Sequence, residues 1–278
     1  MITPFAPRSP ARPLVMGVVN VTPDSFSDGG RFAGPDAACE HALALMDQGA
    51  DWLDIGGEST RPGAQPVSET EEMDRVLPVI EAIRAARPGA LISIDTIKPG
   101  VAGAAIGAGA SLWNDVSALR TDGALEMAAG LGRPVCLMHM QGEPRTMQDA
   151  PRYDDVVTDV ARFLGQRAGA AIAAGVAREH ILLDPGIGFG KALTHNLALL
   201  GALEHFAGLG FPILVGASRK RFIAGIDPSA TDAADRLGGS LAAALYGARA
   251  GVAMVRVHDV RETVQALDVQ AAILQARL

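Results

Sequence analysis

The stretch VMGVVNVTPDSFSDGG at residues 15–30 contains the pattern on which the fold prediction depends. An apolar run from Val15 to Val19 stops at Asn20, and a segment rich in Gly, Pro, Ser and Asp follows. The run is short and apolar enough for a buried strand. The segment after it is too polar for a strand and too rich in Gly, Pro and Asp for a helix. The stretch therefore predicts a buried strand that ends in a polar residue and leads into a polar loop.

The same order of strand and connection recurs along the chain. Short apolar runs lie at residues 15–19, 52–55, 91–94, 111–113, 135–138, 181–183, 213–215 and 253–257. Stretches with helical spacing lie between or after them, at residues 36–50, 68–86, 153–176, 230–250 and 260–275. Ser68 and Glu71 form a capping-box pattern at the start of one such stretch.

Repeated alternation of strand and helix, with no break in composition, predicts an α/β protein of the (β/α)8 TIM barrel type. The barrel is expected to span residues 14–278 as one domain, after a flexible, proline-rich leader at residues 1–13. A doubly wound open sheet is the alternative. The absence of a clear G-x-G-x-x-G motif after any predicted strand weakens it.

Composition limits the classes of partner. Hydrophobic residues make up 49% of the 278 residues, which is enough for a large core, and the net charge of −7 argues against nucleic acid as the main partner. No apolar run reaches the roughly 18 residues of a membrane span, and the first 13 residues do not resemble a signal peptide. Cys39 and Cys136 lack metal-site spacing and are expected to be buried thiols. We therefore expect a cytoplasmic protein with small-molecule partners.

Polar side chains follow the predicted strands, where barrel enzymes place their active sites. Asp95, Asn114, Asp184 and Lys220 offer several hydrogen-bond acceptors and a few donors. Such a set would suit a flat heterocycle with amidine and amide edges. It does not resemble a carboxylate metal site, because the residues come from separate strands. The alternative role for Asp95 and Asp184 is to cap the helices that follow them.

A second group of residues is positively charged. Arg61, Arg256 and His258 are expected at the same rim, and Arg256 and His258 are two residues apart, so they face the same side of a strand. They could converge on one anion, and the amides after Ser218 would add donors. Asn20 offers a neutral amide oxygen to Mg²⁺, an ion that would take further ligands from a pyrophosphate.

Seven ordered motifs together resemble the dihydropteroate synthase family, from about residue 14 to the C-terminus. They are NVTPDSFSDGG (20–30), GGESTRPGA (56–64), SIDT (93–96), WNDVS (113–117), DPGIGFGK (184–191), GASRK (216–220) and VRVHDV (255–260). The resemblance implies a (β/α)8 barrel. It also implies a transferase that joins p-aminobenzoate to 6-hydroxymethyl-7,8-dihydropterin pyrophosphate in folate biosynthesis. It further implies Mg²⁺ as cofactor, inhibition by sulfonamides and a homodimer.

The resemblance also implies roles for individual residues. Pterin binding falls to Asp95, Asn114, Asp184, Lys220 and Arg256. Pyrophosphate binding falls to Thr60, Arg61, Arg256, Val257 and His258, and Mg²⁺ binding to Asn20. The p-aminobenzoate pocket and its catalytic loops comprise Phe26, Asp28, Arg61, Pro62, Phe189, Ser218 and Arg221. Arg221 stands where many family members have serine, so the p-aminobenzoate carboxylate is expected to use backbone amides instead.

The implied chemistry needs a site that neutralises the departing pyrophosphate and tolerates a cation delocalised over the pterin ring. An aniline nitrogen is neutral at pH 7, so no strong general base is expected, and His139 is interpreted as structural. Residues 21–31 are expected to close over the bound pyrophosphate and exclude water. The alternatives are a methyltetrahydrofolate-type pterin methyltransferase and a non-catalytic pterin-binding paralogue.

Overall fold

The computed structural model describes residues 4–5, 12–22, 35–59, 65–142 and 146–276. Five residues named above lie outside these ranges: Phe26, Asp28, Thr60, Arg61 and Pro62. Most of the 21–31 loop and most of the 1–13 leader also lie outside them.

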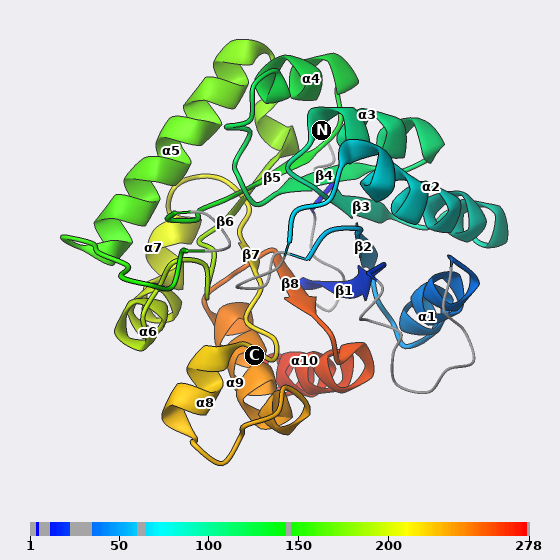
Figure 1. Cartoon of the computed structure of the whole chain (residues 1–278). Coiled ribbons are helices and arrows are strands. Elements are labelled where there is room, and N and C mark those ends of the chain that lie inside the picture. Colours follow the sequence, from blue (N-terminus) through cyan, green and yellow to red (C-terminus); the bar gives the residue numbers. More distant parts are fainter. Residues whose placement is uncertain (1–3, 6–11, 23–34, 60–64, 143–145, 277–278) are drawn as a thin grey trace.

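The described residues form eight parallel strands that alternate with helices (Figure 1). The strands are β1 (Leu14–Asn20), β2 (Trp52–Gly56), β3 (Ile92–Asp95), β4 (Leu112–Asp115), β5 (Val135–Met138), β6 (Ile181–Asp184), β7 (Leu214–Val215) and β8 (Met254–Val257). They pair in the order β6-β5-β4-β3-β2-β1-β8-β7. A parallel bridge between Leu183 and Ile213 joins the two ends of this order. The (β/α)8 barrel is thus confirmed, and the open sheet is excluded.

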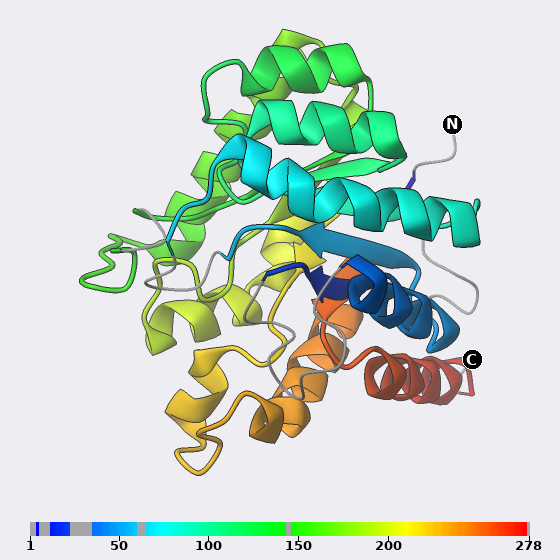
Figure 2. The same ribbon diagram turned by 45° about the vertical axis from the view of Figure 1, so that its right-hand side comes forward.

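Helices surround the strands on the outside (Figures 1 and 2). They are α1 (Pro35–Asp47), α2 (Glu69–Ala86), α3 (Pro99–Ala108), α4 (Ala124–Leu131), α5 (Val156–Ala174), α6 (Leu193–Gly201), α7 (Leu203–Ala207), α8 (Arg221–Ile226), α9 (Leu237–Arg249) and α10 (Val260–Gln275). Within the described ranges, no helix is long and apolar enough to cross a bilayer.

One capping pattern and one helix start differ from the sequence prediction. Ser68 caps α2 by accepting a hydrogen bond from the Glu71 amide (3.1 Å), but the Glu71 carboxylate pairs with Arg75 (2.5 Å) instead of completing the capping box. The predicted helix at 230–250 begins only at Leu237, because the preceding residues form turns and a short 3-10 helix at Ala234–Arg236. The short helices α3, α4, α6, α7 and α8 were not predicted individually.

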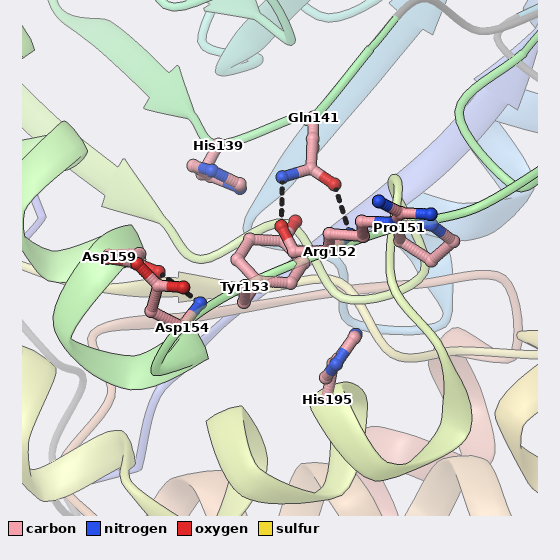
Figure 3. A pocket seen from close by; sticks show the side chains of 8 residues that line it. All are labelled: His139, Gln141, Pro151, Arg152, Tyr153, Asp154, Asp159 and His195. Atoms are coloured by element: carbon pink, nitrogen blue, oxygen red, sulfur yellow. Dashed lines mark hydrogen bonds between the residues drawn. The ribbon is translucent and has the colours of Figure 1, made fainter.

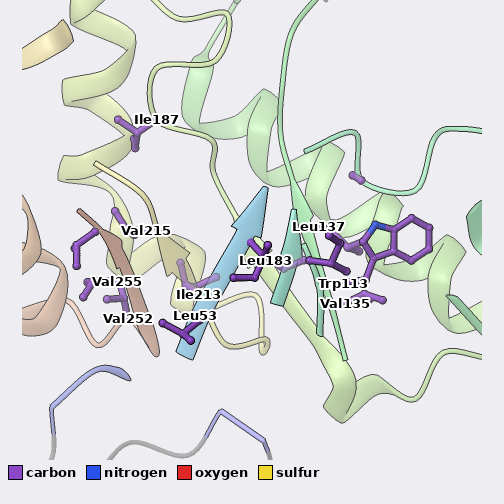
Figure 4. Close-up of a cluster of buried hydrophobic side chains, with 14 of the residues drawn as sticks. Leu53, Trp113, Val135, Leu137, Leu183, Ile187, Ile213, Val215, Val252 and Val255 are labelled. Carbon is purple, nitrogen blue, oxygen red and sulfur yellow. The ribbon is translucent and has the colours of Figure 1, made fainter. Parts of the chain in front are cut away.

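The hydrophobic core has two parts. The larger part lies between the strands and the surrounding helices and includes Leu53, Trp113 and Val255 (Figure 4). The smaller part fills the barrel interior near the amino ends of the strands. It consists of Phe5, Leu14, Met16, Trp52, Leu112, Cys136, Leu182, Leu214 and Met254. Because strand side chains alternate with period 2, the residue two positions after Trp52, Leu112, Leu182 or Met254 also faces the interior, one layer closer to the carboxyl ends.

Residues near the amino end of the chain pack against this barrel. Phe5 is buried, and its ring centroid lies 6.5 Å from that of Trp52. Arg12 pairs with Asp51 (3.2 Å) and Asp268 (2.9 Å). Both cysteines are free, and Cys136 is buried as predicted. Burial was wrong for Cys39, which lies on α1 and is partly exposed.

Gly186 lies in the loop after β6, which packs tightly against the carbonyl of His139. Its φ is +70°, and a Cβ at this position would overlap the carbonyl oxygen of His139. Gly186→Ala should therefore lower the free energy of unfolding by about 3 kcal/mol, as measured by urea denaturation. Gly89→Ala is the control, because a Cβ there meets nothing within 4 Å. Equal stability of the two variants would contradict this account of the loop.

Candidate active site

Toward the carboxyl ends of the strands, the apolar interior of the barrel gives way to a layer of charged side chains. Arg256 on β8 is the centre of this charged layer. Its Nε donates to Asp54 Oδ2 (2.6 Å) and its Nη2 donates to Asp95 Oδ2 (2.9 Å). Asn114 Nδ2 also donates to Asp54 Oδ2 (3.1 Å). Side chains from β2, β3, β4 and β8 therefore form one connected cluster at the carboxyl end of the barrel. Three of the residues predicted to bind pterin belong to it.

Asp54 is the member that the sequence analysis missed. It lies in the middle of the apolar run WLDI, and its side chain is fully buried. Its Oδ1 atom has no hydrogen-bond partner among the described residues. The available signal was a charged residue at an interior-facing position of a buried strand, two residues after Trp52.

Asp184 and Lys220 occupy the β6 and β7 side of the same end of the barrel. Asp184 is buried, and its Oδ1 accepts a hydrogen bond from the Gly186 amide (2.7 Å). That amide belongs to a turn, so Asp184 does not cap a helix. Lys220 donates to the carbonyl of Ile187, and its Nζ lies 4.5 Å from the centroid of the Phe189 ring. A Cβ on Gly216 would lie within 4 Å of both Lys220 and Arg256, so the two cations flank one glycine.

Burial controls the electrostatics of these groups. It raises the pKa of Asp95, an effect that the neighbouring Asp54 charge increases and Arg256 opposes. Burial also raises the pKa of Asp184, against the charge of Lys220. The pKa of Lys220 falls to about 8 because burial outweighs the attraction of Asp184. The site therefore holds desolvated carboxylates beside cations, an arrangement that can accept hydrogen bonds from ring N–H and amino groups.

Two of the predicted anion-binding residues, Val257 and His258, directly follow Arg256 in the chain. His258 Nδ1 is 3.1 Å from Ser218 Oγ, which also accepts a hydrogen bond from the His258 amide (3.2 Å). Val257 is buried, and Arg221 is exposed at the first position of α8. Arg256, expected to join His258 on one anion, is engaged by Asp54 and Asp95. The structure thus pairs Ser218 with His258 and ties Arg256 to the carboxylates.

Asn20 lies at the end of β1, half-buried and paired in register with Gly56, which in turn pairs with Asp95. Its amide oxygen is thus near the charged cluster. Within the described ranges, no group of three or more His, Cys, Asp or Glu side chains could hold a metal ion. A cation at Asn20 would therefore need further oxygen ligands from a bound anion and water, which is the coordination that Mg²⁺ accepts.

A buried lysine and histidine lie behind the Phe189 loop. Lys191 Nζ donates to the carbonyl of Phe189 (2.9 Å) and lies 3.0 Å from His139 Nδ1. Burial lowers the pKa of Lys191 to about 7, and burial together with Lys191 lowers that of His139 to about 3. His139 is therefore neutral at pH 7 and packs edge-on against Phe163, in agreement with the structural role expected for it. Lys191 was not singled out from the sequence.

A cavity of about 630 Å³ lies next to this pair (Figure 3). Two of its polar side chains bond the protein itself: Gln141 bonds the backbone of Arg152 in both directions (2.7 and 2.9 Å), and Tyr153 Oη donates to the carbonyl of Gly190 (2.8 Å). None of the predicted site residues lines this cavity. The charged layer of the barrel, and not this cavity, carries the groups suited to chemistry.

The fold and this charged layer are those of a barrel enzyme with a polar site at the carboxyl ends of its strands, and comparison with known proteins identifies the family. A family model described as "Pterin binding enzyme" matches residues 16–258. Dihydropteroate synthase of Escherichia coli K12 is 50% identical over 270 residues, which cover 96% of this chain and 94% of the relative. The chain belongs to the dihydropteroate synthase family.

Solved structures agree with this assignment. The Xanthomonas albilineans dihydropteroate synthase with 4-aminobenzoic acid has a TM-score of 0.89 and 51% identity, covering 95% of this chain and 93% of the other. The Yersinia pestis enzyme in complex with a sulfonamide drug has a TM-score of 0.89 and 49% identity, covering 95% of each chain. The (β/α)8 fold and the family predicted from the sequence are both confirmed.

The shared guanidinium yields a second prediction. Asp54→Asn removes the buried charge that pairs with Arg256 Nε. The free energy of unfolding at pH 7 should fall by about 3 kcal/mol, since breaking a buried ion pair leaves its partner incompletely compensated. The matched control is Asp47→Asn, which breaks an exposed pair with Arg87 and should cost less than about 1 kcal/mol. Urea denaturation measures both, and a stability change in Asp54→Asn no larger than in the control would refute the prediction.

Proposed function

We propose that this chain transfers the 7,8-dihydropterin-6-ylmethyl group from its pyrophosphate to p-aminobenzoate and releases pyrophosphate, a step of folate biosynthesis. The observation that carries the proposal is the connected cluster of Asp54, Asp95, Asn114 and Arg256 at the carboxyl end of the barrel. The family membership and the solved relatives with 4-aminobenzoic acid or a sulfonamide agree with it.

The pterin would bind in the charged layer. Asp95 and Asp184 would accept hydrogen bonds from ring N–H and amino groups, while Asn114 and Lys220 would meet the carbonyl and ring nitrogens. Arg256, held in plane by Asp54 and Asp95, would lie against the ring. Because the carboxylates are desolvated, they would also stabilise positive charge that develops on the ring as the leaving group departs.

The pyrophosphate would lie toward His258, Thr60 and Arg61, with the amide of Val257. The bond between the methylene carbon and the pyrophosphate oxygen breaks, and the p-aminobenzoate nitrogen forms the new bond and loses a proton. His258 would stabilise charge on the leaving oxygens. Asn20 would hold Mg²⁺, which neutralises charge on pyrophosphate oxygens when bound.

The p-aminobenzoate would bind next to Phe189, whose ring Lys220 covers. Ser218, tied to His258, and Arg221 at the start of α8 would line the far end. Phe26, Asp28, Arg61 and Pro62 would complete the pocket. We propose that sulfonamides occupy this pocket as well, as the Yersinia pestis complex supports.

Turnover is the direct test of this function. The purified chain, supplied with the pterin pyrophosphate, p-aminobenzoate and Mg²⁺, should form dihydropteroate. Asp184→Asn should lower kcat/KM by about 10- to 100-fold, the value of a hydrogen bond to a charged group. Asp155→Asn, at the exposed N-cap of α5, is the control and should leave turnover unchanged.

The result also separates the alternative functions. No dihydropteroate, combined with tight pterin binding, would identify a non-catalytic paralogue. Methyl transfer from methyltetrahydrofolate without pyrophosphate dependence would identify the methyltransferase.

We further propose a homodimer in the cytoplasm. The two free cysteines support that compartment. Exposed apolar side chains gather on α9 and α10: Tyr246, Val269, Ile273 and Leu274. A shallow groove of about 260 Å³ runs between the same two helices. Contiguous apolar surface of this kind is typical of a subunit interface.

Charge introduced on this face should dissociate the dimer. Val269→Glu combined with Ile273→Glu should give a monomer in light scattering coupled to gel filtration, because both side chains are more than half exposed. Leu197→Glu on α6 places the same charge on an exposed leucine elsewhere and should leave the dimer intact. If both variants remained dimeric, the face formed by α9 and α10 would not be the interface.

A further inference from the structure

Beside the charged layer lies a second ionic cluster, formed by Glu58, Glu72 and Lys98. Lys98 Nζ donates to Glu58 Oε2 (2.5 Å) and to Glu72 Oε2 (2.5 Å). Glu72 is fully buried, and about four-fifths of the Glu58 and Lys98 side chains is covered. None of the three residues has been assigned a part in substrate binding. Buried ion pairs of this kind in general add little to the free energy of unfolding. We therefore expect a role of this cluster other than stability.

The cluster holds both ends of the connection between β2 and α2. Glu58 lies two residues after the end of β2, and its second oxygen, Oε1, accepts a hydrogen bond from the Val67 amide (3.2 Å). The Glu58 side chain thus links the start of the connection to Val67, near its end. The carbonyl of Gly57 accepts a further hydrogen bond from Arg75 on α2 (2.7 Å).

The start of the connection also packs tightly on α2. A Cβ on Gly57 would lie 2.7 Å from Val76 Cγ1 and 3.0 Å from Glu72 Cγ. A side chain larger than hydrogen is therefore excluded at this position. Helix α2, which carries Glu72, thus packs directly against the start of the connection, and Lys98 forms ion pairs with both Glu72 and Glu58.

Lys98 connects this assembly to the strand that carries Asp95. It lies three residues after Asp95 and is the N-cap residue of α3. Its amide donates to Thr96 Oγ1 (3.2 Å), and the Thr96 carbonyl accepts from Trp113 Nε1 (2.7 Å). Burial lowers the pKa of Lys98, but the hydrogen bonds that Lys98 donates to Glu58 and Glu72 outweigh it and raise the pKa, so the ammonium is charged at neutral pH. The loop ends are thus fixed relative to Asp95.

We propose that Glu58 and Lys98 are positioning residues for the transfer to p-aminobenzoate. They hold the ends of the β2–α2 connection at a set distance from Asp95, and do so without touching the pterin. This inference rests on the proposed function, which assigns residues of the same connection to substrate contacts. It predicts that loss of the cluster affects transfer and leaves pterin binding intact.

The variant Glu58→Ala tests the proposal because it removes the bonds to both Lys98 and Val67. We expect kcat/KM for p-aminobenzoate to fall by more than about 10-fold, toward the roughly 100-fold that a displacement of about 1 Å can cause. The dissociation constant of 6-hydroxymethyl-7,8-dihydropterin, measured by calorimetry, should stay within about threefold of wild type. This probe lacks the pyrophosphate and so reports on the charged layer alone.

Conservative variants separate positioning from general stability. Lys98→Arg keeps the charge and should recover most of the kcat/KM that Lys98→Met loses. Because Lys98→Met leaves two carboxylates facing each other and could prevent folding, the double variant Lys98→Met with Glu72→Met is measured beside it. The matched control is Arg162→Met, which breaks an exposed pair with Asp159 and should change neither kinetics nor pterin binding.

The outcomes distinguish the inference from the function beneath it. Wild-type protein without turnover would overturn both. Wild-type turnover with an unchanged kcat/KM in Glu58→Ala would overturn the positioning role alone. A loss of pterin affinity equal to the loss of kcat/KM would show a general structural role and would also overturn it. Selective loss of kcat/KM, restored in Lys98→Arg, would support the proposal.

Discussion

The shared guanidinium of Arg256 is the interaction on which the site depends. Asp54 and Asp95 come from neighbouring strands, and their burial disfavours two negative charges in one small volume. Arg256 lies between them with one nitrogen directed at each, and Asn114 donates to the same Asp54 oxygen. Without that cation the upper layer of the barrel would hold unpaired charges, which low-dielectric interiors do not tolerate.

The barrel makes this charged layer possible by filling its other end. Below the cluster, apolar side chains from Phe5 to Met254 close the interior and exclude water from the amino ends of the strands. Toward the carboxyl ends, four of the same strands supply a polar side chain two residues further along, namely Asp54, Asn114, Asp184 and Arg256. Period-2 alternation thus converts one short strand into both a core element and a site element. The large outer core then only has to hold the helices in place.

Two described segments beside the site are fixed by lysine side chains. The turn after β6 is held by Lys220 on one side and by Lys191 on the other, and both donate to its carbonyl oxygens. The connection after β2 is held by the Glu58, Glu72 and Lys98 cluster. In both places the lysine ammonium groups are largely buried. Lys220 and Lys98 reach groups that are distant in the sequence, and Lys191 donates to a carbonyl two residues away. Rigid loop ends of this kind let substrate contacts be made with little loss of conformational entropy on binding.

The eight apolar runs, their polar final residues and the ordered motifs were local features, so the sequence by itself determined the barrel, the family and the layer in which Asp95, Asn114, Asp184 and Arg256 lie. Which groups pair was decided by the tertiary structure. In the sequence, Asp54 is a single charged residue within an apolar run. Only the folded barrel brings it into contact with Arg256, some two hundred residues away. Lys98 likewise carried no pattern of its own, and the motif that ends at Lys191 did not indicate its contact with His139. Pair energies depend on distance and burial, and both are set by how the strands close into a barrel and not by spacing along the chain.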